Sequence, residues 1–291
     1  MSAQHVLDVA RPGSSRLRIE HLTRFTYERT VPASYNECRL MPVSEARQQV
    51  LSARVNLEPV TWRREYVDYW GTRVVAFEAH TAHEKLEVLS QVDAVVAAAG
   101  PAPDAGWDAV RDPRVRDRLC ELLSATERST PGDELAALAQ EAAAGRRPSD
   151  AARAVCRAVT QGMEYQAGAT GVHTVAAQAW EDRRGVCQDF AQLAVGALRA
   201  VDIPARYVSG YLHPKADAVV GETVKGESHA WVEWWAGEWY GWDPTNDKPA
   251  GHQHVVVGRG RDYGDVPPVR GIIAGGGGAS LSVEVAVTTL R

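Results

Sequence analysis

The sequence predicts an α+β fold in two parts, and three observations support this prediction. The first hundred residues alternate between apolar and polar side chains, which is the pattern of β-strands with one buried face. Residues 113–162 show helical patterning instead. The region after residue 185 combines a long amphipathic helix with several strands. A chain of 291 residues is also long for one compact core and natural for two domains.

Composition and charge narrow the class of protein. Hydrophobic residues make up 45% of the chain and charged residues 24%, which are typical values for soluble globular proteins. The net charge of -5 leaves no surplus of Lys and Arg to neutralise phosphates. The start of the chain lacks the apolar segment of a signal peptide, and no stretch approaches the ~20 apolar residues of a membrane span. We therefore expect a cytoplasmic protein without nucleic-acid or membrane partners.

The N-terminal part is expected to be an antiparallel β domain. Residues 16–31, 51–67 and 73–96 alternate in polarity and are rich in β-forming residues. Asp68-Tyr69-Trp70-Gly71 between the last two segments predicts a hairpin turn.

A change of composition marks the domain boundary. The Ala-, Gly- and Pro-rich residues 97–106 are typical of a linker. We therefore expect an N-terminal β domain over residues 1–98 and a catalytic core over residues 99–291. The alternating stretch 281–290 predicts a final strand, which we assign to this core.

The helix that begins at Cys187 is the clearest element of the second part. A clean i, i+3, i+4, i+7 pattern predicts one apolar face, formed by Phe190, Leu193, Ala194, Ala197, Leu198 and Val201. Gly185 provides a bend before this helix, and Pro204 ends it.

Cys187 stands at or next to the first position of that helix. The positive end of the helix dipole favours a thiolate there. Cys120 and Cys156 lie in helical patterns, where core packing is expected. The four cysteines form no CxxC pair, so neither a disulfide framework nor a zinc cluster is expected.

A thiolate nucleophile needs a base, and the base needs an orienting partner. Two strands, "HAWVEWW" and "EWYGWDPT", are joined through Ala236-Gly237. A two-residue turn at these positions places His229 within one residue of Asp243 in register. Each of the three residues taken alone has a structural explanation. Their combination, with a cysteine at a helix start and a His–Asp pair on adjacent strands, favours catalysis.

The residues match a known family at this point. The chain resembles the bacterial transglutaminase-like family of the papain-like cysteine-enzyme superfamily. The resemblance rests on "GVCQDFAQLAVGALRAVDIPARYVSGYL" (185–212), "ESHAWVEWWAGEWYGWDPTN" (227–246) and "VVVGRGRDYGDVPPVRG" (255–271). Residues 22–42 and 68–88 are similar to the β domain that precedes the core in this family.

The resemblance implies a papain-like core in which the cysteine helix packs on an antiparallel sheet. It implies Cys187 as nucleophile, His229 as base and Asp243 as orienting acid. The chain departs from the family pattern in a tryptophan-rich hairpin, which carries Trp234, Trp235, Trp239 and Trp242.

The function implied is thiol-dependent acyl transfer or hydrolysis of an amide in a peptide or protein, through a thioester and without a cofactor. An arylamine acetyltransferase shares the Cys-His-Asp logic, but the sequence around Cys187 favours the transglutaminase-like motif. The alternative from another class is a non-catalytic peptide-binding module that retains the fold. Hydrolysis is slightly favoured, because residues 213–228 predict a mobile flap that admits water and no acidic cluster is evident to attract an amine.

Further candidate residues carry weaker signals. Trp180, Tyr207 and Tyr211 could line the substrate cleft, although core packing is the favoured role for Trp180. Asp189 and Arg206 could pair beneath the site.

His252 and His254 have i, i+2 spacing, which places them on one face of a strand. We expect no metal there, because no third ligand is identifiable. Asp262 and Asp265 lie in a motif shared with the family and have no evident chemical role.

Overall fold

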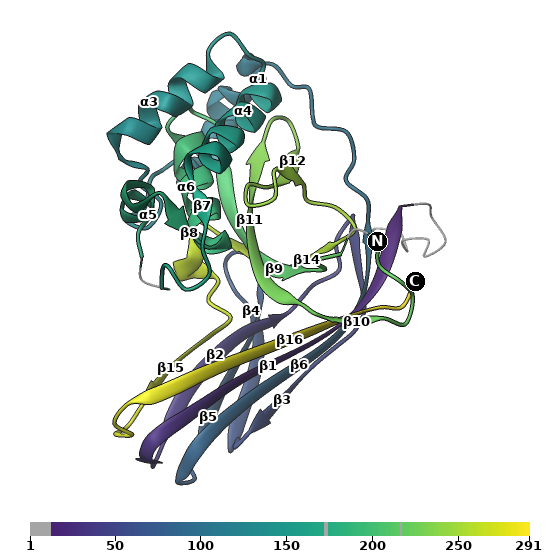
Figure 1. Ribbon diagram of the computed structural model, residues 1–291, viewed down its shortest axis with the longest axis vertical. Helices are drawn as coiled ribbons and strands as arrows, with labels where there is room; N and C mark the ends of the chain where they lie inside the picture. The colour runs from purple at the N-terminus through teal and green to yellow at the C-terminus, as the bar shows by residue number, and fades with distance from the viewer. Residues whose placement is uncertain (1–12, 172–173, 216) are drawn as a thin grey trace.

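The computed structural model describes residues 13–171, 174–215 and 217–291. It confirms the α+β class with antiparallel sheets (Figure 1). The helical elements are α1 (Trp107–Val110), α2 (Pro113–Arg118), η1 (Cys120–Leu122), α3 (Gly132–Ala143), α4 (Pro148–Gly162), α5 (Ala176–Asp182), α6 (Cys187–Arg199) and η2 (Tyr263–Asp265). No helix in these ranges has the length and apolar character needed to cross a membrane.

The strands occupy both ends of the chain and much of its second half. They are β1 (Ser14–Val31), β2 (Ser34–Met41), β3 (Gln48–Glu58), β4 (Trp62–Val67), β5 (Arg73–Ala79), β6 (His83–Ala97), β7 (Glu164–Tyr165), β8 (Arg184–Gly185), β9 (Ala205–Leu212), β10 (Thr223–Lys225), β11 (Glu227–Trp235), β12 (Trp239–Asp243), β13 (Lys248–Pro249), β14 (His254–Gly260), β15 (Val269–Ile273) and β16 (Ala279–Thr289). Two of the stretches read as single strands each divide in two, into β3 and β4 and into β5 and β6.

Two sheets of the N-terminal region pack face to face. One sheet has the strand order β10-β16-β1-β6-β3 and the other the order β15-β2-β5-β4. Alternate residues of both sheets point into a shared apolar core, which includes Tyr27, Val31, Met41, Phe77 and Leu86. The β4–β5 hairpin expected around residues 68–71 is present, with Val67 opposite Arg73.

The long strands β1 and β6 contribute to two apolar clusters, one inside the N-terminal sandwich and one against the second half of the molecule. Their ends near the linker contact the second half of the molecule, where Leu17, Ile19 and Val92 pack against Tyr211 and Val255. In Figure 1 these strands run beneath the sheet that carries β9 and β14. That sheet, the core sheet, is therefore covered by a second sheet on one side, which excludes water from its interior.

The C-terminal strands differ from the expectation that they belong to the catalytic core. Strand β16 pairs with β1 over eleven residue pairs, and β15 pairs with β2. The reason is apolar packing, because Val285 and Val287 lie on the face of β16 that packs against Leu17 and Ile19. Both ends of the chain thus contribute to the N-terminal sandwich.

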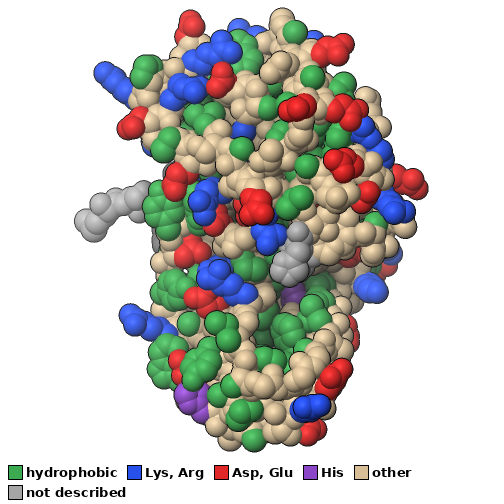
Figure 2. Space-filling view, turned by 90° about the vertical axis from the view of Figure 1, so that its left-hand side faces the viewer, with side chains coloured by type: hydrophobic (Ala, Val, Ile, Leu, Met, Phe, Trp, Pro, Cys, Tyr) green, Lys and Arg blue, Asp and Glu red, His purple; other side chains and the backbone are tan. Residues whose placement is uncertain are grey.

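One side of that sandwich is open. Figure 2 shows a hollow with hydrophobic walls in the lower half of the molecule, on the side where β15 and β16 lie in Figure 1. On β16, Leu281 and Val283 are largely exposed although they continue the apolar face of Val285. Acidic and basic side chains are interspersed over the upper part of the same view.

The core sheet has the strand order β13-β12-β11-β9-β14 and is covered by α6 on its other side. Helix α6 is buried all round, because α3, α4 and α5 surround the surface that the sheet leaves free. The tryptophans of the hairpin belong to this core: Trp234, Trp235 and Trp242 are buried and Trp239 packs beside them.

A buried ionic network joins the two halves of the molecule. Arg259 donates to both oxygens of Glu45 at 2.7 and 2.9 Å, and it also pairs with Glu233 at 2.8 Å. Glu233 in turn accepts from Arg206. Burial alone raises the pKa of Glu233, but the two arginines outweigh burial and lower that pKa. The N-terminal region is thus linked to the core sheet through compensated charges.

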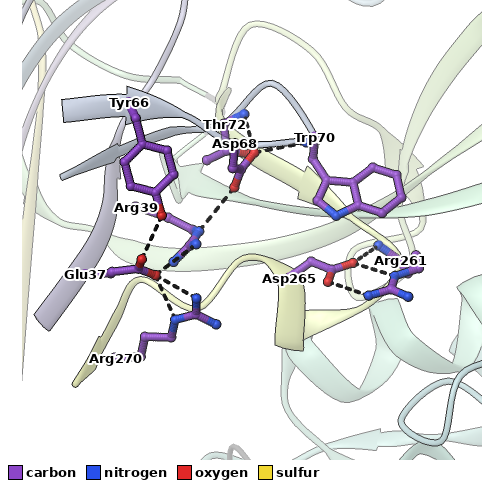
Figure 3. Close-up of polar contacts among 9 residues, drawn as sticks. All are labelled: Glu37, Arg39, Tyr66, Asp68, Trp70, Thr72, Arg261, Asp265 and Arg270. Atoms are coloured by element: carbon purple, nitrogen blue, oxygen red, sulfur yellow. Dashed lines mark hydrogen bonds and ion pairs between the residues drawn. The ribbon is translucent and has the colours of Figure 1, made fainter. Parts of the chain in front are cut away.

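The β4–β5 hairpin makes a second junction, drawn in Figure 3. The Asp68 carboxylate accepts the backbone N–H groups of Trp70 and Thr72 at 3.0 and 2.9 Å, which fixes the turn. The guanidinium of Arg261 lies 5.8 Å from the centre of the Trp70 ring and pairs with Asp265. Asp265 therefore has a structural role, since it holds an arginine against the hairpin.

The close contact of α6 with its neighbours gives a prediction on stability. A Cβ at Gly196 would lie 1.8 Å from the backbone oxygen of Ser129. Gly196→Ala should therefore destabilise the protein by about 2–3 kcal/mol, although alanine ordinarily favours a helix over glycine. Gly106→Ala is the control, because no atom lies within 4 Å of its Cβ position. Urea denaturation of both variants measures the effect, and a Gly196→Ala variant as stable as the parent would contradict it.

Candidate active site

Cys187 is the first residue of α6, as the sequence predicts. The turn that leads into the helix is held by Asp189, whose Oδ2 accepts the N–H of Val186 at 2.8 Å and the hydroxyl of Thr170. A Cβ at Gly185 would lie 2.7 Å from that oxygen, so the bend depends on glycine. This arrangement holds the thiol at the positive end of the buried helix.

The surroundings of Cys187 differ from those of the buried cysteines. Cys187 is partly exposed, whereas Cys38 and Cys156 are buried. Burial raises the pKa of the Cys38 thiol to about 12 and raises that of Cys156 as well. These two thiols are kept protonated, which suits their place in apolar cores.

His229 and Asp243 are in contact, but not through the register expected from the sequence. The turn between β11 and β12 has three residues, 236–238, because Trp235 pairs with Trp239. Gly237 occupies the positive-φ position of this turn, with φ 95°. Asp243 is therefore diagonal to His229 and on the same face of the hairpin. The Nε2 atom of His229 lies 2.8 Å from Oδ2 of Asp243.

The Asp243 carboxylate is fully buried and accepts hydrogen bonds from several directions. Oδ1 accepts the backbone N–H groups of Thr245 and Asn246 at 3.0 and 3.2 Å. Oδ2 accepts from the Asn246 side chain at 2.7 Å and from Nε2 of His254 at 3.1 Å, besides His229. Burial alone raises the pKa of this carboxyl, but the two histidines hold the pKa of Asp243 well below its usual range.

His229 lies between this carboxylate and the thiol. Since Nε2 donates to Asp243, Nδ1 is the nitrogen left for Cys187. Burial alone lowers the pKa of His229, but its hydrogen bonds to Asp243 and Cys187 outweigh burial and raise that pKa above its usual value. A raised imidazole pKa beside a thiol favours the thiolate–imidazolium pair.

The structure places the other predicted cleft residues differently. Trp180 is buried: its Nε1 donates to Glu134 at 3.0 Å, and Arg183 covers its ring at 4.0 Å. Tyr211 is also buried, and its hydroxyl contacts His21 at 3.1 Å in the junction between the two halves. Neither side chain leaves surface for a substrate. Trp180 therefore has the core-packing role that the sequence favours for it, and Tyr211 does not line the cleft.

Tyr207 lies beneath the candidate site rather than at its edge. Burial raises the pKa of Tyr207, and the charge of Cys187 raises it further. Tyr207 belongs to the apolar core against which Cys187 packs. Only 2% of Tyr207 is exposed, so it supports the site from below. Tyr207 packs in the core beneath α6, whereas Tyr211 packs in the junction with the N-terminal sheet. A β-bulge in β14 interrupts the ladder alongside them, and bulges increase the twist of a sheet.

Tyr165 is an exposed aromatic that sequence reasoning missed. It lies on β7 opposite Gly185, two residues before Cys187, and 48% of it is exposed. Burial raises its pKa, and so do the charges of Glu227 and Cys187. The signal was absent from the sequence because β7 is two residues long and its partner β8 lies nineteen positions away.

Two pairings suggested by the sequence do not form. Asp189 supports the start of α6, while Arg206 pairs with Glu233 on the opposite side of the sheet. His252 and His254 line different cavities. Of the two, His254 is the one that contacts Asp243. Asp262 accepts the N–H of Gly264 at 2.6 Å and so caps η2.

Among the residues that the structure describes, His229, Asp243 and His254 form a group that could hold a metal ion, with one ligand atom of each within 4.8 Å of the others. In the structure these atoms are joined to one another by hydrogen bonds. A metal ion would have to displace both protons. The donor set therefore fits a proton-holding network better than a metal centre.

Residues 213–228, expected to form a mobile flap, are partly anchored. Strand β10 within this segment pairs with β16, and Gly226 donates to the carbonyl of Val285 at 2.9 Å. The His213 ring contacts Thr289 at 3.2 Å. The described part of the segment is thus attached to the N-terminal sheet, because its apolar residue Val224 packs against that sheet.

Comparisons with known proteins agree with this architecture. The model of the family described as "Transglutaminase-like superfamily" matches residues 136–244. The model of the family described as "Bacterial transglutaminase-like N-terminal region" matches residues 17–95. The first match contains Cys187, His229 and Asp243.

Three relatives illustrate the similarity. The uncharacterized protein ML0607 of Mycobacterium leprae is 43% identical over 94% of this chain and 99% of its own. A protein-glutamine gamma-glutamyltransferase of Pseudomonas aeruginosa is 37% identical over 26% of this chain and 12% of its own. A Cytophaga hutchinsonii crystal structure, provisionally assigned as a cysteine protease, superposes with a TM-score of 0.75 at 20% identity. That superposition covers 96% of this chain and 91% of the other, and it shows a common fold.

Fold, family matches and near-full-length similarity lead to one conclusion: the chain belongs to the bacterial transglutaminase-like family, with a transglutaminase-like core behind the N-terminal region of that family.

Proposed function

We propose that the protein is a cysteine enzyme that transfers the acyl group of a peptide or protein amide, through a thioester on Cys187, chiefly to water. The observation that carries the proposal is the buried contact of 2.8 Å between His229 and Asp243. This contact leaves the other imidazole nitrogen for a thiol at the start of α6. Family membership supports thiol-dependent chemistry in general.

The reaction follows from the positions of these groups. The thiolate of Cys187 attacks the amide carbonyl, and the carbonyl oxygen takes up negative charge. The first N–H groups of α6, at Cys187 and Gln188, have no acceptor within the helix and are suited to stabilise that oxyanion. The His229 imidazolium protonates the leaving amine as the C–N bond breaks. Water, deprotonated by His229, then cleaves the thioester and regenerates the thiol.

The surroundings of the thiol support water as the main acceptor. The charge of Glu227 acts on Tyr165 beside the start of α6, as the charge of Cys187 does. A lysine side chain as acceptor would need more acidic groups to hold its ammonium near the thioester. Tyr165 provides an exposed aromatic surface at the same place, which suits contact with a substrate chain.

Mass spectrometry of a peptide library incubated with the protein tests the proposal. Deamidated glutamine, amine-linked product and backbone cleavage each have a distinct mass. A library that stays unchanged, together with a Cys187 that iodoacetamide alkylates no faster than a free thiol, would favour a non-catalytic peptide-binding module instead.

The first prediction concerns the nucleophile. Cys187→Ala should abolish turnover and leave the fold intact, because the position is partly exposed and alanine suits a helix start. Activity and circular dichroism of the variant measure this. Cys120→Ala is the matched control, since Cys120 is exposed and lies in η1, outside the triad. Residual turnover above a few per cent of the parent rate would place the nucleophile elsewhere.

The second prediction concerns the orienting acid. Asp243→Asn should reduce kcat by several orders of magnitude, since the matching change in a serine-protease triad costs ~10⁴. The amide stabilises the wrong tautomer of His229 and removes the charge that keeps the imidazole protonated. Asp247→Asn is the control, because Asp247 pairs with Arg157 on the surface. A nearly normal kcat in Asp243→Asn would mean that another group orients His229.

The third prediction concerns the acceptor. With a reactive glutamine peptide and a millimolar primary amine supplied together, hydrolysed product should exceed amine-linked product. Quantitative mass spectrometry of both products gives the ratio. A predominance of amine-linked product would identify the protein as a transamidating enzyme and overturn the preference for water.

A further inference from the structure

His254 is a buried histidine outside the triad that contacts the triad carboxylate directly. Its Nε2 lies 3.1 Å from the same Oδ2 of Asp243 that accepts from His229. Only 3% of His254 is exposed. The two imidazole rings lie with centroids 6.1 Å apart, and Trp231 lies against both. One carboxylate oxygen is thus shared by two histidines that are both buried.

The backbone sets the tautomer of His254. The N–H of Gly251 donates to Nδ1 of the ring at 3.2 Å, so Nδ1 carries no proton. The proton of the neutral ring is then on Nε2, which donates to Asp243. Protonation of Nδ1 would place two N–H groups against each other. The loop before β14 therefore keeps His254 as a neutral ring with one donor.

Electrostatics favours the same state. The ring faces His229 on β11, Asp243 on β12 and Lys248 on β13. Burial lowers the pKa of His254, and the positive charges of His229 and Lys248 lower it further, while Asp243 acts in the opposite direction. The net shift is downward, so His254 is neutral at physiological pH. His229, whose pKa is raised, carries the positive charge of the network.

We propose that His254 is a positioning residue: a neutral imidazole that donates to Asp243 and holds its carboxylate toward His229. This inference rests on the proposed function, since it assigns His254 a role in the same triad. The other side-chain donor to Oδ2, Asn246, is exposed, so its bond competes with water. His254 provides the donor that water cannot replace.

Close packing places His254 at this position. Trp231 crosses β9 over Gly210, where a Cβ would lie 2.6 Å from the indole. The ring of His254 meets this indole edge-on at 5.2 Å. The His254 ring is therefore fixed by packing against Trp231 as well as by its two hydrogen bonds.

The test compares three variants in the full-length protein. His254→Leu removes the donor, His254→Gln retains a neutral donor near the position of Nε2, and His252→Leu alters a half-buried neighbour that does not contact Asp243. We expect His254→Leu to lower kcat by about 10–100-fold with KM unchanged within twofold, as for other supporting hydrogen-bond partners in active sites. His254→Gln should recover most of the rate, and His252→Leu should match the parent.

Two readouts do not require turnover. Nitrogen-15 NMR of the histidine rings should show His254 neutral with its proton on Nε2 at pH 7. The Nε2 proton resonance of His229 should broaden in His254→Leu and persist in His254→Gln. The rate of Cys187 alkylation by iodoacetamide at pH 7 should fall about tenfold in His254→Leu, with recovery in His254→Gln.

The outcomes separate the inference from the proposed function. A charged His254, or a folded His254→Leu variant with an unchanged His229 resonance, would overturn the positioning role. So would a His254→Gln variant as impaired as His254→Leu, with all variants matched in Tm. If no amide is turned over but the resonances change as expected, the proposed function fails while the positioning of Asp243 by His254 stands.

Discussion

The buried carboxylate of Asp243 is the constraint on which the candidate site depends. A buried carboxylate is tolerated only when its oxygens accept enough hydrogen bonds to replace those to water. The donors to Asp243 come from β11, from the turn after β12 and from the start of β14. Each of these segments is thereby fixed relative to the others. Once Asp243 is satisfied in this way, His229 has one defined orientation, with one ring nitrogen left for Cys187.

The helix that carries Cys187 is constrained at both ends. At its start, Asp189 holds the turn, and at its end the buried Arg199 donates to the carbonyls of Leu122, Ser124, Ala205 and Arg261. Burial lowers the pKa of Arg199 to about 10, which leaves it charged at neutral pH. A cation at the C-terminal end complements the helix dipole, while the other end presents the thiol. Gly196 permits the close approach of the Ser129 backbone that buries the helix.

The N-terminal sandwich and the C-terminal core form one continuous structure. The long strands β1 and β6 cover the core sheet, and β16 returns the end of the chain to the first sheet. The Glu45–Arg259–Glu233 network and the hairpin of Figure 3 add polar contacts at the junction. Because the sheet is buried on both sides, the polar groups of the site lie in a low-dielectric environment. Hydrogen bonds and charges act more strongly there than in water.

Local patterns in the sequence were sufficient for the fold class, for the helix start at Cys187 and for the contact between His229 and Asp243. These features depend on periodicity and on residues close in the chain, so their physical causes are visible locally. Local patterns were not sufficient for the exact register of the hairpin. A turn of two residues and a turn of three residues both fit the same sequence, and Gly237 is suited to both.

Tertiary structure decided which residues surround the candidate site. His254 joins Asp243 although β14 and β12 are not neighbours in the sheet, and a strand of two residues places Tyr165 opposite Gly185. The final strand joined the N-terminal sheet because its valines complete an apolar surface formed by distant residues. Trp180 and Tyr211 are buried by packing partners that local patterning does not reveal. The sequence by itself determined the chemistry available at the site, and long-range packing determined its supporting residues, since such contacts leave no period in the chain.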